Sequence, residues 1–283
     1  MTFHDPRLHA YRPDLADEQL RGRVEADRYV VGRPFHIRVG TLPLRSEPSP
    51  ESPQASELLF GEPVSVFDIA NGWAWVQNSV DGYVGYVEAK GLASGQDIPT
   101  HRVSVLRTYL YAEANLKSPA RELLSMNSPV SVASIDGPFC RVADGGWIWA
   151  EHLAPADVFE SDHGDVAFRF VGTPYLWGGR SSVGLDCSGL VQMALLRCGT
   201  SAPRDSDMQA QSLGTAVPFG GEQAVLARGD LVFWPGHVGI WLSADQFMHA
   251  NATHMLTVVE PFEDADRRIR EATGDRVSVV RRP

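Results

Sequence analysis

The sequence predicts a multidomain protein in which two small all-β modules precede an α+β domain. Its 283 residues exceed what one hydrophobic core usually organises. Between about residues 33 and 156, short segments of alternating hydrophobicity are separated by Gly, Pro, Asn and Asp, which is typical of small all-β units. From about residue 157 an apolar pattern with helical spacing is followed by further short strands. We therefore expect four parts: 1–32, 33–97, 98–156 and 157–283.

The two β modules are predicted from an internal repeat. Glu57-Leu58-Leu59 with Pro63–Val66 is echoed, 65 to 66 residues later, by Glu122-Leu123-Leu124 with Pro129–Val132. Each copy continues through an Asn-Gly or Asp-Gly turn and ends in a strand rich in aromatic residues and glycine. Two related modules therefore follow one another. Before them, a charged segment at about 16–26 predicts one short helix.

The composition excludes some classes of partner. A formal net charge of −10 argues against nucleic-acid binding, which relies on clustered Lys and Arg. No segment has the roughly 18 apolar residues that a membrane-spanning helix needs, and the first residues lack the apolar core of a signal peptide. The odd set of Cys140, Cys187 and Cys198 is typical of free thiols in a reducing compartment. We therefore expect a cytoplasmic protein.

A predicted helix at 187–198 places Cys187 in its first turn. Apolar side chains recur with helical spacing along this segment, and Asp186 is a suitable N-cap. The unpaired backbone N–H groups and the helix dipole favour a thiolate at Cys187, whereas the Asp186 carboxylate opposes them by raising the pKa of the thiol. The sequence leaves this balance open. Cys198 lies on the apolar stripe and Cys140 in the second β module, so both are predicted to be structural thiols.

A cysteine nucleophile needs an adjacent base, and two histidines are suitable. Residues 230–234, 237–242 and 246–250 predict three short strands that pair antiparallel. This pairing places His237 beside His249, so that His237 can accept the thiol proton while His249 fixes its tautomer. His254 competes for the third role, but it follows the last strand. We expect a Cys-His-His triad without metal or other cofactor, because no zinc-type Cys and His spacing is present.

Five motifs carry a family resemblance: YLWGG, DCSG, GDLVFW, HVGIWL and FMHA, in this order between about residues 165 and 265. They resemble the NlpC-type family of papain-like cell-wall cysteine peptidases, and the β modules resemble bacterial SH3-like barrels. The resemblance implies two SH3-like barrels followed by an α+β papain-like catalytic domain. Within it Cys187 is the nucleophile, His237 the general base and His249 the third member. Tyr175 would help the Cys187 N–H to receive the oxyanion; its plainer interpretation is an aromatic residue lining a loop.

The resemblance also implies a substrate, the bond between γ-D-glutamate and a diamino acid (meso-diaminopimelate or L-Lys) in murein stem peptides. The tandem modules resemble the dipeptidyl-peptidase VI-like subgroup, which recycles free peptides beginning with L-Ala. A free α-ammonium needs a carboxylate partner, since a buried unpaired charge is costly. By similarity, the substrate-binding residues are Asp186, Ser188, Asp205, Glu57 and Tyr83. In the plainer interpretation Asp186 only caps its helix, Asp205 braces a turn with Arg204, and Glu57 and Tyr83 lie on the barrel surface.

Two other functions stay open. The Cys-His pair is also compatible with an amidase or acyltransferase acting on another acyl substrate, because related folds host such chemistry. Alternatively, the chain is a non-catalytic protein that binds cell-wall peptides through its barrels. The sequence predicts no oligomeric state.

Overall fold

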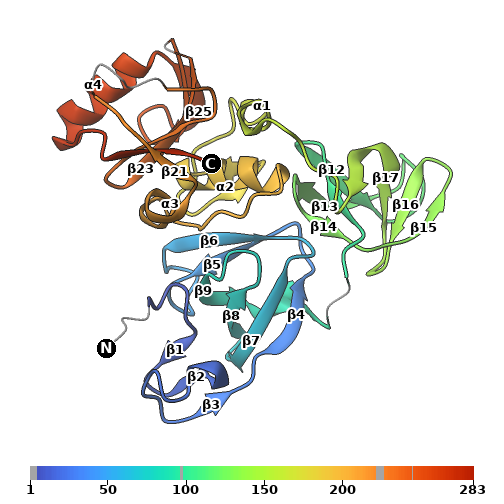
Figure 1. Ribbon diagram of the computed structural model, residues 1–283. Helices are drawn as coiled ribbons and strands as arrows, with labels where there is room; N and C mark the ends of the chain where they lie inside the picture. The colour runs from blue at the N-terminus through green and yellow to red at the C-terminus, as the bar shows by residue number, and fades with distance from the viewer. Residues whose placement is uncertain (1–4, 96–97, 221–225, 244) are drawn as a thin grey trace. The chain divides into compact units, whose positions relative to one another are not determined.

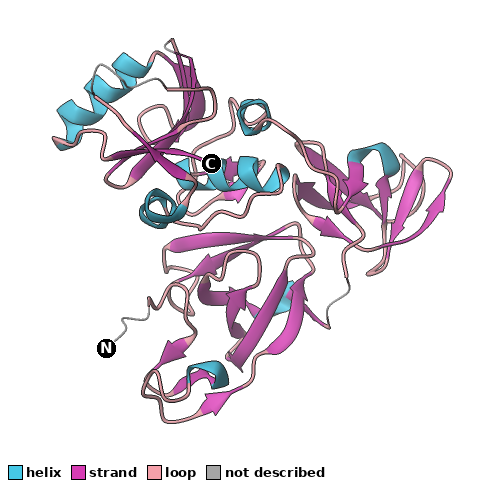
Figure 2. Ribbon diagram, in the orientation of Figure 1, coloured by secondary structure: helices cyan, strands magenta, loops and turns pink. Residues whose placement is uncertain are grey.

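The computed structural model describes residues 5–95, 98–220, 226–243 and 245–283, and it divides into two compact units, 1–158 and 159–283. The N-terminal unit consists of short strands and single 3-10 turns, whereas the C-terminal unit combines helices with a larger sheet (Figure 2). The predicted boundary between the β modules falls at residue 97, which lies outside the described residues.

The N-terminal segment contains no helix where one was expected. The predicted helix at about 16–26 is wrong, because this segment holds the end of a strand and one turn of 3-10 helix. Leu15 is fully buried and packs with Trp75 of the following module, so tertiary packing overrides the local helix propensity. The elements of this segment are β1 (Tyr11–Arg12), β2 (Leu15–Asp17), η1 (Glu18–Leu20) and β3 (Tyr29–Val30).

The first β module is a seven-stranded antiparallel sheet with the order β10-β4-β7-β8-β9-β5-β6. The predicted Asn71-Gly72 turn joins β7 to β8 with φ angles of 51° and 82°, which is the conformation that a tight hairpin needs. Leu58 and Val66 are fully buried in its core. The elements are β4 (Arg33–Ile37), β5 (Thr41–Arg45), β6 (Gln54–Leu59), β7 (Pro63–Ala70), β8 (Trp73–Asn78), β9 (Val84–Glu88), η2 (Ala89–Gly91) and β10 (Leu92–Ser94).

The second β module repeats this strand order. Its strands run β18-β11-β14 and β15-β16-β17-β12-β13, which matches the first module strand for strand when β14 and β15 together correspond to β7. It has its own core, with Leu124 and Ile148 fully buried. The elements are β11 (His101–Val103), β12 (Arg107–Tyr111), β13 (Ala120–Ser125), β14 (Pro129–Val130), β15 (Val132–Asp136), β16 (Phe139–Val142), β17 (Trp147–Trp149), η3 (Ala150–His152) and β18 (Leu153–Pro155).

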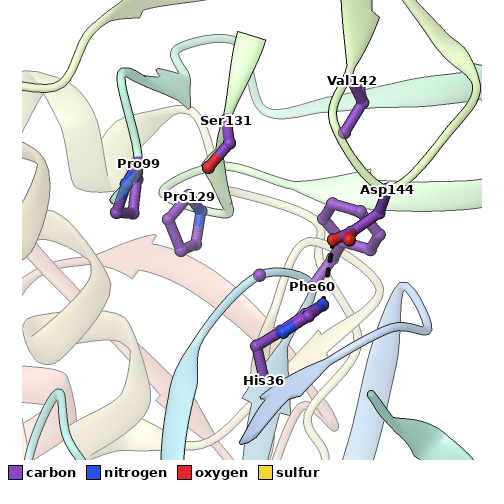
Figure 3. A pocket seen from close by; sticks show the side chains of 8 residues that line it. His36, Phe60, Pro99, Pro129, Ser131, Val142 and Asp144 are labelled. Carbon is purple, nitrogen blue, oxygen red and sulfur yellow. Dashed lines mark ion pairs between the residues drawn. The ribbon is translucent and has the colours of Figure 1, made fainter. Parts of the chain in front are cut away.

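The two β modules are in close contact within the N-terminal unit. Phe60 follows the last residue of β6, yet it lies in the core of the second module. His36 donates from Nδ1 to the Gly95 carbonyl at 2.9 Å, and its Nε2 lies 2.9 Å from the carboxylate of Asp144. His36, Phe60 and Asp144 border a pocket of about 20 Å³ (Figure 3), which has room for about one water molecule.

The C-terminal unit is an α+β domain around a six-stranded sheet with the order β21-β26-β22-β23-β24-β25 (Figure 1). The three strands and the helix predicted around the candidate site are confirmed as β22, β23, β24 and α2. The elements are α1 (His163–Phe168), β19 (Arg180–Ser181), β20 (Gly184–Leu185), α2 (Cys187–Arg197), α3 (Ser206–Ser212), β21 (Thr215–Val217), β22 (Leu231–Trp234), β23 (His237–Ser243), β24 (Gln246–Asn251), β25 (Leu256–Glu260), α4 (Phe262–Thr273) and β26 (Val279–Arg282).

Helices cover both faces of this sheet. Helix α2 contacts β23 and β24, and its side chains are buried almost all round. Helix α4 packs through Phe262 and Ala265 against Trp234 and Phe247. Successive side chains of a strand point to opposite faces, so His249, two residues from Phe247, shares the face that α4 covers. Within the described ranges, no helix has both the length and the apolar character needed to cross a membrane.

Candidate active site

Cys187 is the first residue of α2. The Asp186 carboxylate accepts a hydrogen bond from the Gly189 N–H at 2.7 Å, which confirms the predicted N-cap. The side chain of Cys187 is buried with the residue 7% exposed. The helix start therefore places the sulfur at a fixed position below the protein surface.

The balance of charges on the thiol, which the sequence left open, favours the neutral form. Burial, followed by the charge of the nearby Asp186 carboxylate, raises the pKa of Cys187 to about 12. Hydrogen bonds from the backbone N–H groups of Val238 and Ser188 favour the thiolate, but they are smaller effects. The helix start alone does not ionise this cysteine, because burial disfavours any charge there.

His237 and His249 form a hydrogen-bonded pair, with 2.8 Å between His237 Nε2 and His249 Nδ1. Ile240 pairs with Met248 across β23 and β24, and continuing this register sets His249 opposite Gly239. His237 lies two residues away on the same face, so the two rings meet diagonally. The prediction that the rings stand side by side is confirmed.

Gly239 is required at this point of the sheet. A Cβ added there would lie 2.3 Å from Cζ of Phe247 and 2.9 Å from the Met248 carbonyl oxygen. Phe247 packs against the His249 ring with centroids 5.1 Å apart. The absence of a side chain at Gly239 thus makes room for the aromatic ring that supports His249.

The strand that begins with His237 also contacts Cys187. The Val238 N–H, one residue beyond His237, hydrogen-bonds to the Cys187 sulfur. Tyr175 belongs to the same neighbourhood: burial raises the pKa of its phenol, and the charge on Cys187 raises it further. The structure therefore brings Cys187, His237, His249 and Tyr175 together.

The two imidazole rings are neutral at neutral pH. Burial, with smaller contributions from the charges of His249 and Arg268, lowers the pKa of His237 to about 3, while Glu260 acts in the opposite direction. Burial also lowers the pKa of His249. A neutral thiol beside a neutral imidazole is suited to general-base activation, in which the proton moves as the sulfur attacks.

Comparisons with known proteins agree with this geometry. The model of the NlpC/P60 family matches residues 172–268, and the model of the bacterial dipeptidyl-peptidase Sh3 domain matches residues 44–92. The C-terminal unit is a cysteine peptidase domain of the NlpC/P60 family. Dipeptidyl-peptidase 6 of Lysinibacillus sphaericus is 25% identical over 232 residues, which is 74% of this chain and 84% of that protein. The γ-D-glutamyl-L-lysine dipeptidyl-peptidase of Bacillus subtilis is 28% identical over 235 residues, 72% of this chain and 76% of its own.

A solved structure shares the fold of most of the chain. The crystal structure of an NlpC/P60 family protein from Bacillus cereus superposes with a TM-score of 0.75, covers 88% of this chain and 99% of its own, and is 22% identical. The multidomain arrangement, with an Sh3 domain before the NlpC/P60 domain, is thereby established.

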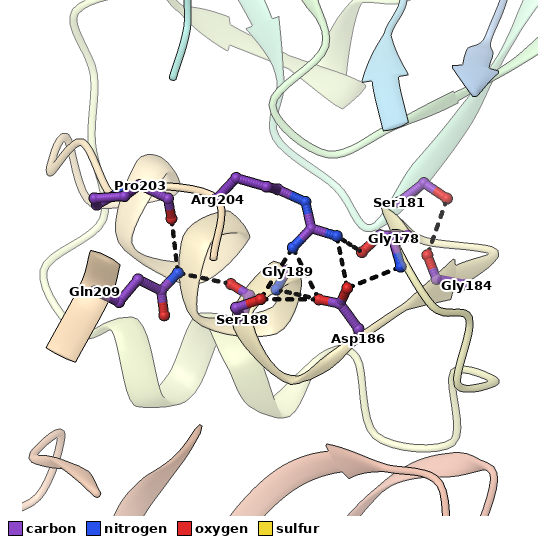
Figure 4. Close-up of polar contacts among 10 residues, drawn as sticks. Gly178, Ser181, Gly184, Asp186, Ser188, Gly189, Pro203, Arg204 and Gln209 are labelled. Atoms are coloured by element: carbon purple, nitrogen blue, oxygen red, sulfur yellow. Dashed lines mark hydrogen bonds and ion pairs between the residues drawn. The ribbon is translucent and has the colours of Figure 1, made fainter. Parts of the chain in front are cut away.

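The NlpC/P60 domain holds a buried arginine that the sequence did not reveal as part of the site. Arg204 donates to both carboxylate oxygens of Asp186, at 3.0 and 2.7 Å, to Ser188 Oγ at 3.0 Å and to the Gly179 carbonyl at 3.2 Å (Figure 4). Asp186 also accepts from the Gly178 N–H at 2.9 Å and from Ser188. The oxygens of Asp186 are therefore already well supplied with donors, and Asp186 and Ser188 form one network with Arg204.

The other predicted substrate residues are Asp205, Glu57 and Tyr83. Asp205 precedes α3 as its N-cap residue but makes no side-chain capping bond. Glu57 and Tyr83 are 4% and 6% exposed within the N-terminal unit. Tyr83 belongs to the core of the first module, so its plainer interpretation as a barrel-surface residue is wrong.

His254, the competitor for the third role, is exposed in the turn after β24 and bonds to Asn251. Cys140 is buried in β16, and Cys198 is the C-cap residue of α2. Burial raises the pKa of both thiols, as expected for structural cysteines. Among the described residues, no three His, Cys, Asp or Glu side chains gather into a group that could hold a metal ion.

Two further residues near the histidine pair escaped the sequence analysis. Glu260, the last residue of β25, lies 2.6 Å from Nε2 of His249, and Arg268 of α4 donates to both oxygens of Glu260. The strand pattern contained a signal for Glu260. His249 pairs with Val258 across the hairpin, so Glu260 is the diagonal neighbour of His249 on the same face.

Proposed function

We propose that this cysteine peptidase hydrolyses the bond between γ-D-glutamate and a diamino acid, meso-diaminopimelate or L-Lys, in murein stem peptides with a free N-terminal L-Ala. The observation that carries the proposal is the hydrogen-bonded pair of His237 and His249 on the strand that contacts the Cys187 sulfur. The names of the two relatives, both dipeptidyl-peptidases, support the peptide substrate.

The triad would act by nucleophilic catalysis. His237 takes the proton from the Cys187 thiol as the sulfur attacks the γ-glutamyl carbonyl carbon, and a thioester forms when the C–N bond breaks. The same imidazole returns the proton to the departing amine of the diamino acid. His237 then removes a proton from a water molecule that attacks the thioester, which releases the γ-carboxylate and restores the thiol.

Two groups are suited to the oxyanion of the tetrahedral intermediates. The Cys187 N–H lies in the first turn of α2, where backbone donors have no partner inside the helix. The Tyr175 hydroxyl is the second candidate, and its raised pKa keeps it protonated as a donor. Donors of this kind stabilise charge that develops only during the reaction.

Selectivity for a free L-Ala amine requires an acidic partner in the bound complex. Asp186 receives no support for this role from its contacts, because Arg204 and three further donors occupy its oxygens. A role in binding the L-Ala amine stays a prediction for Asp205, for Ser188 on the Arg204 network, and for Glu57 with Tyr83. Glu57→Gln and Tyr83→Phe test them, since either residue, if it binds the amine, raises KM for the free peptide when replaced and leaves kcat nearly unchanged.

The second β module is proposed to be another SH3-like barrel, because its strand order matches that of the module recognised as an Sh3 domain. The free cysteines fit a reducing compartment, so we propose that the protein acts in the cytoplasm, in recycling of murein peptides.

The deciding experiment compares L-Ala-γ-D-Glu-meso-diaminopimelate with its N-acetylated form. We expect release of L-Ala-D-Glu and the free diamino acid from the first peptide, detected by mass spectrometry, and at least ten-fold slower release from the second. Cys187→Ala removes the activity, whereas Cys198→Ala in the same helix retains it. Failure of the wild-type protein to cleave the free peptide would refute the proposed substrate, and equal cleavage of both peptides would refute selectivity for the amine.

A further inference from the structure

The histidine pair continues into a carboxylate and a guanidinium. His237 Nε2 lies 2.8 Å from His249 Nδ1, and His249 Nε2 lies 2.6 Å from Oε1 of Glu260. The other oxygen of Glu260 accepts from Arg268 Nη1 at 2.9 Å. His249 is 1% exposed and the Glu260 side chain 14% exposed. A line of four side chains therefore runs from the base to the outer helix α4.

The charge at the end of this line is fixed. Burial alone would raise the pKa of Glu260, but hydrogen bonds from His249 and Arg268 hold it at about 2. An ionised carboxylate has no hydrogen to donate and only accepts. Glu260 therefore requires a hydrogen on Nε2 of His249.

The tautomer of His249 in turn determines the tautomer of His237. A neutral imidazole carries one hydrogen, so His249 with its hydrogen on Nε2 presents an acceptor at Nδ1. His237 must then donate from its Nε2, which leaves its Nδ1 without a hydrogen. That nitrogen is the one left to accept the proton of Cys187, and one carboxylate thereby sets the tautomers of two rings in series.

We propose that Glu260 is a positioning residue of the active site, which orders the tautomers of His249 and His237 so that His237 is ready to accept the Cys187 proton, with Arg268 holding Glu260 in place. The role rests on the proposed function of this site, since it assigns His237 as the base. A purely structural alternative is that the two residues tie α4 to the edge strand β25.

The charges of Glu260 and Arg268 distinguish the positioning role from the structural one, because they change the pKa of His237 in opposite directions. The carboxylate raises the pKa of His237, and the guanidinium lowers it. Other ionisable groups of this site include Cys187 with Asp186 and Arg204 around the start of α2, the nearby Tyr175, and His254 in the turn after β24. None of these is altered when Glu260 or Arg268 is replaced.

The test measures alkylation of Cys187 by iodoacetamide as a function of pH, in full-length protein in which Cys140 and Cys198 are also monitored by peptide mass spectrometry. This readout needs no peptide substrate. Glu260→Gln is expected to slow labelling at neutral pH about 10- to 100-fold, by analogy with the loss of the outer hydrogen-bond partner of a metal-bound histidine. It is also expected to move the acidic limb of the pH profile to lower pH. Arg268→Gln is expected to move that limb to higher pH.

Two control variants complete the design. Glu260→Asp keeps the charge and should leave the limb near its wild-type position even if the shorter side chain slows labelling. Arg270→Gln removes another guanidinium of α4, which pairs with Asp266, and should change neither rate nor limb. Thermal unfolding of each variant separates loss of folding from loss of reactivity.

The outcomes are distinct. In one outcome, Glu260→Gln and Arg268→Gln lower the unfolding temperature alike, while the acidic limbs of their labelling profiles stay in place or shift in the same direction. Glu260 and Arg268 then only tie α4 to β25, and the proposal is overturned. A Glu260→Gln labelling rate within two-fold of wild type also overturns it. If the acidic limbs of the two variants shift in opposite directions but the wild-type protein cleaves no murein peptide, the positioning role of Glu260 is supported and only the proposed substrate is refuted.

Discussion

Replacement of Arg204 by Met should destabilise the catalytic domain strongly. The Arg204 side chain is 1% exposed and that of Asp186 is 10% exposed, and their closest atoms lie 2.7 Å apart. Removing one partner of a buried ion pair leaves the other charge without compensation, which costs about 3 to 5 kcal/mol. Arg204→Met also removes the donors to Ser188 and Gly179, so we expect the upper end of this range.

A double-mutant cycle measured by urea unfolding, followed by circular dichroism, tests this reasoning. Asp186→Asn retains an N-cap side chain, and the double variant with Arg204→Met should lose about 1 to 3 kcal/mol less than the sum of the single changes, as expected for residues in contact. Arg228→Met is the matched control: this side chain is 41% exposed and pairs with Asp162 and Asp165, so its loss should cost less than about 1 kcal/mol. Equal costs for Arg204→Met and Arg228→Met, or strict additivity in the cycle, would refute the account.

Three further predictions concern the histidine pair and its surroundings. Gly239→Ala places a Cβ 2.3 Å from Phe247, so it should cost about 1 to 3 kcal/mol and slow alkylation of Cys187; normal unfolding and labelling would contradict the assigned packing. Folding lowers the pKa values of His237 and His249, so the unfolded chain binds more protons than the folded chain below about pH 6.5. As the pH falls, each histidine should therefore reduce the unfolding free energy by up to about 1.4 kcal/mol per pH unit. Urea titrations that show no such loss between pH 6 and 5 would contradict the burial of these histidines as neutral rings. Tyr175→Phe should lower kcat for the free peptide about 100-fold with little change in KM or stability, and an unchanged kcat would assign the hydroxyl no part in the oxyanion site.

Local patterns made the centre of the site predictable. The N-cap Asp186 and the apolar spacing after it determine where α2 begins, and they place Cys187 in the first turn. His237 and His249 are twelve residues apart on neighbouring strands of a hairpin, so antiparallel pairing alone brings them together. Both features depend on short stretches of chain, which is why the sequence suffices.

The remaining contacts depend on tertiary packing. Arg204 reaches Asp186 from a loop eighteen residues away in sequence, and no periodic pattern specifies the direction of a loop side chain. Arg268 meets Glu260 because α4 packs on the sheet through Phe262 and Ala265. The missed 3-10 turn has the same cause, since burial of Leu15 against the first module decides the conformation there. The neutral thiol also follows from burial, which the sequence did not specify for Cys187.

The protonation state of the histidine pair is the most direct test of the account. In protein labelled with nitrogen-15 in its histidines, heteronuclear NMR at neutral pH distinguishes the two tautomers and the imidazolium of each ring. The structure predicts two neutral rings, with the hydrogen of both His237 and His249 on Nε2 and a bare Nδ1 on His237. A charged His237 at rest, or a hydrogen on its Nδ1, would contradict general-base activation of Cys187 by this ring.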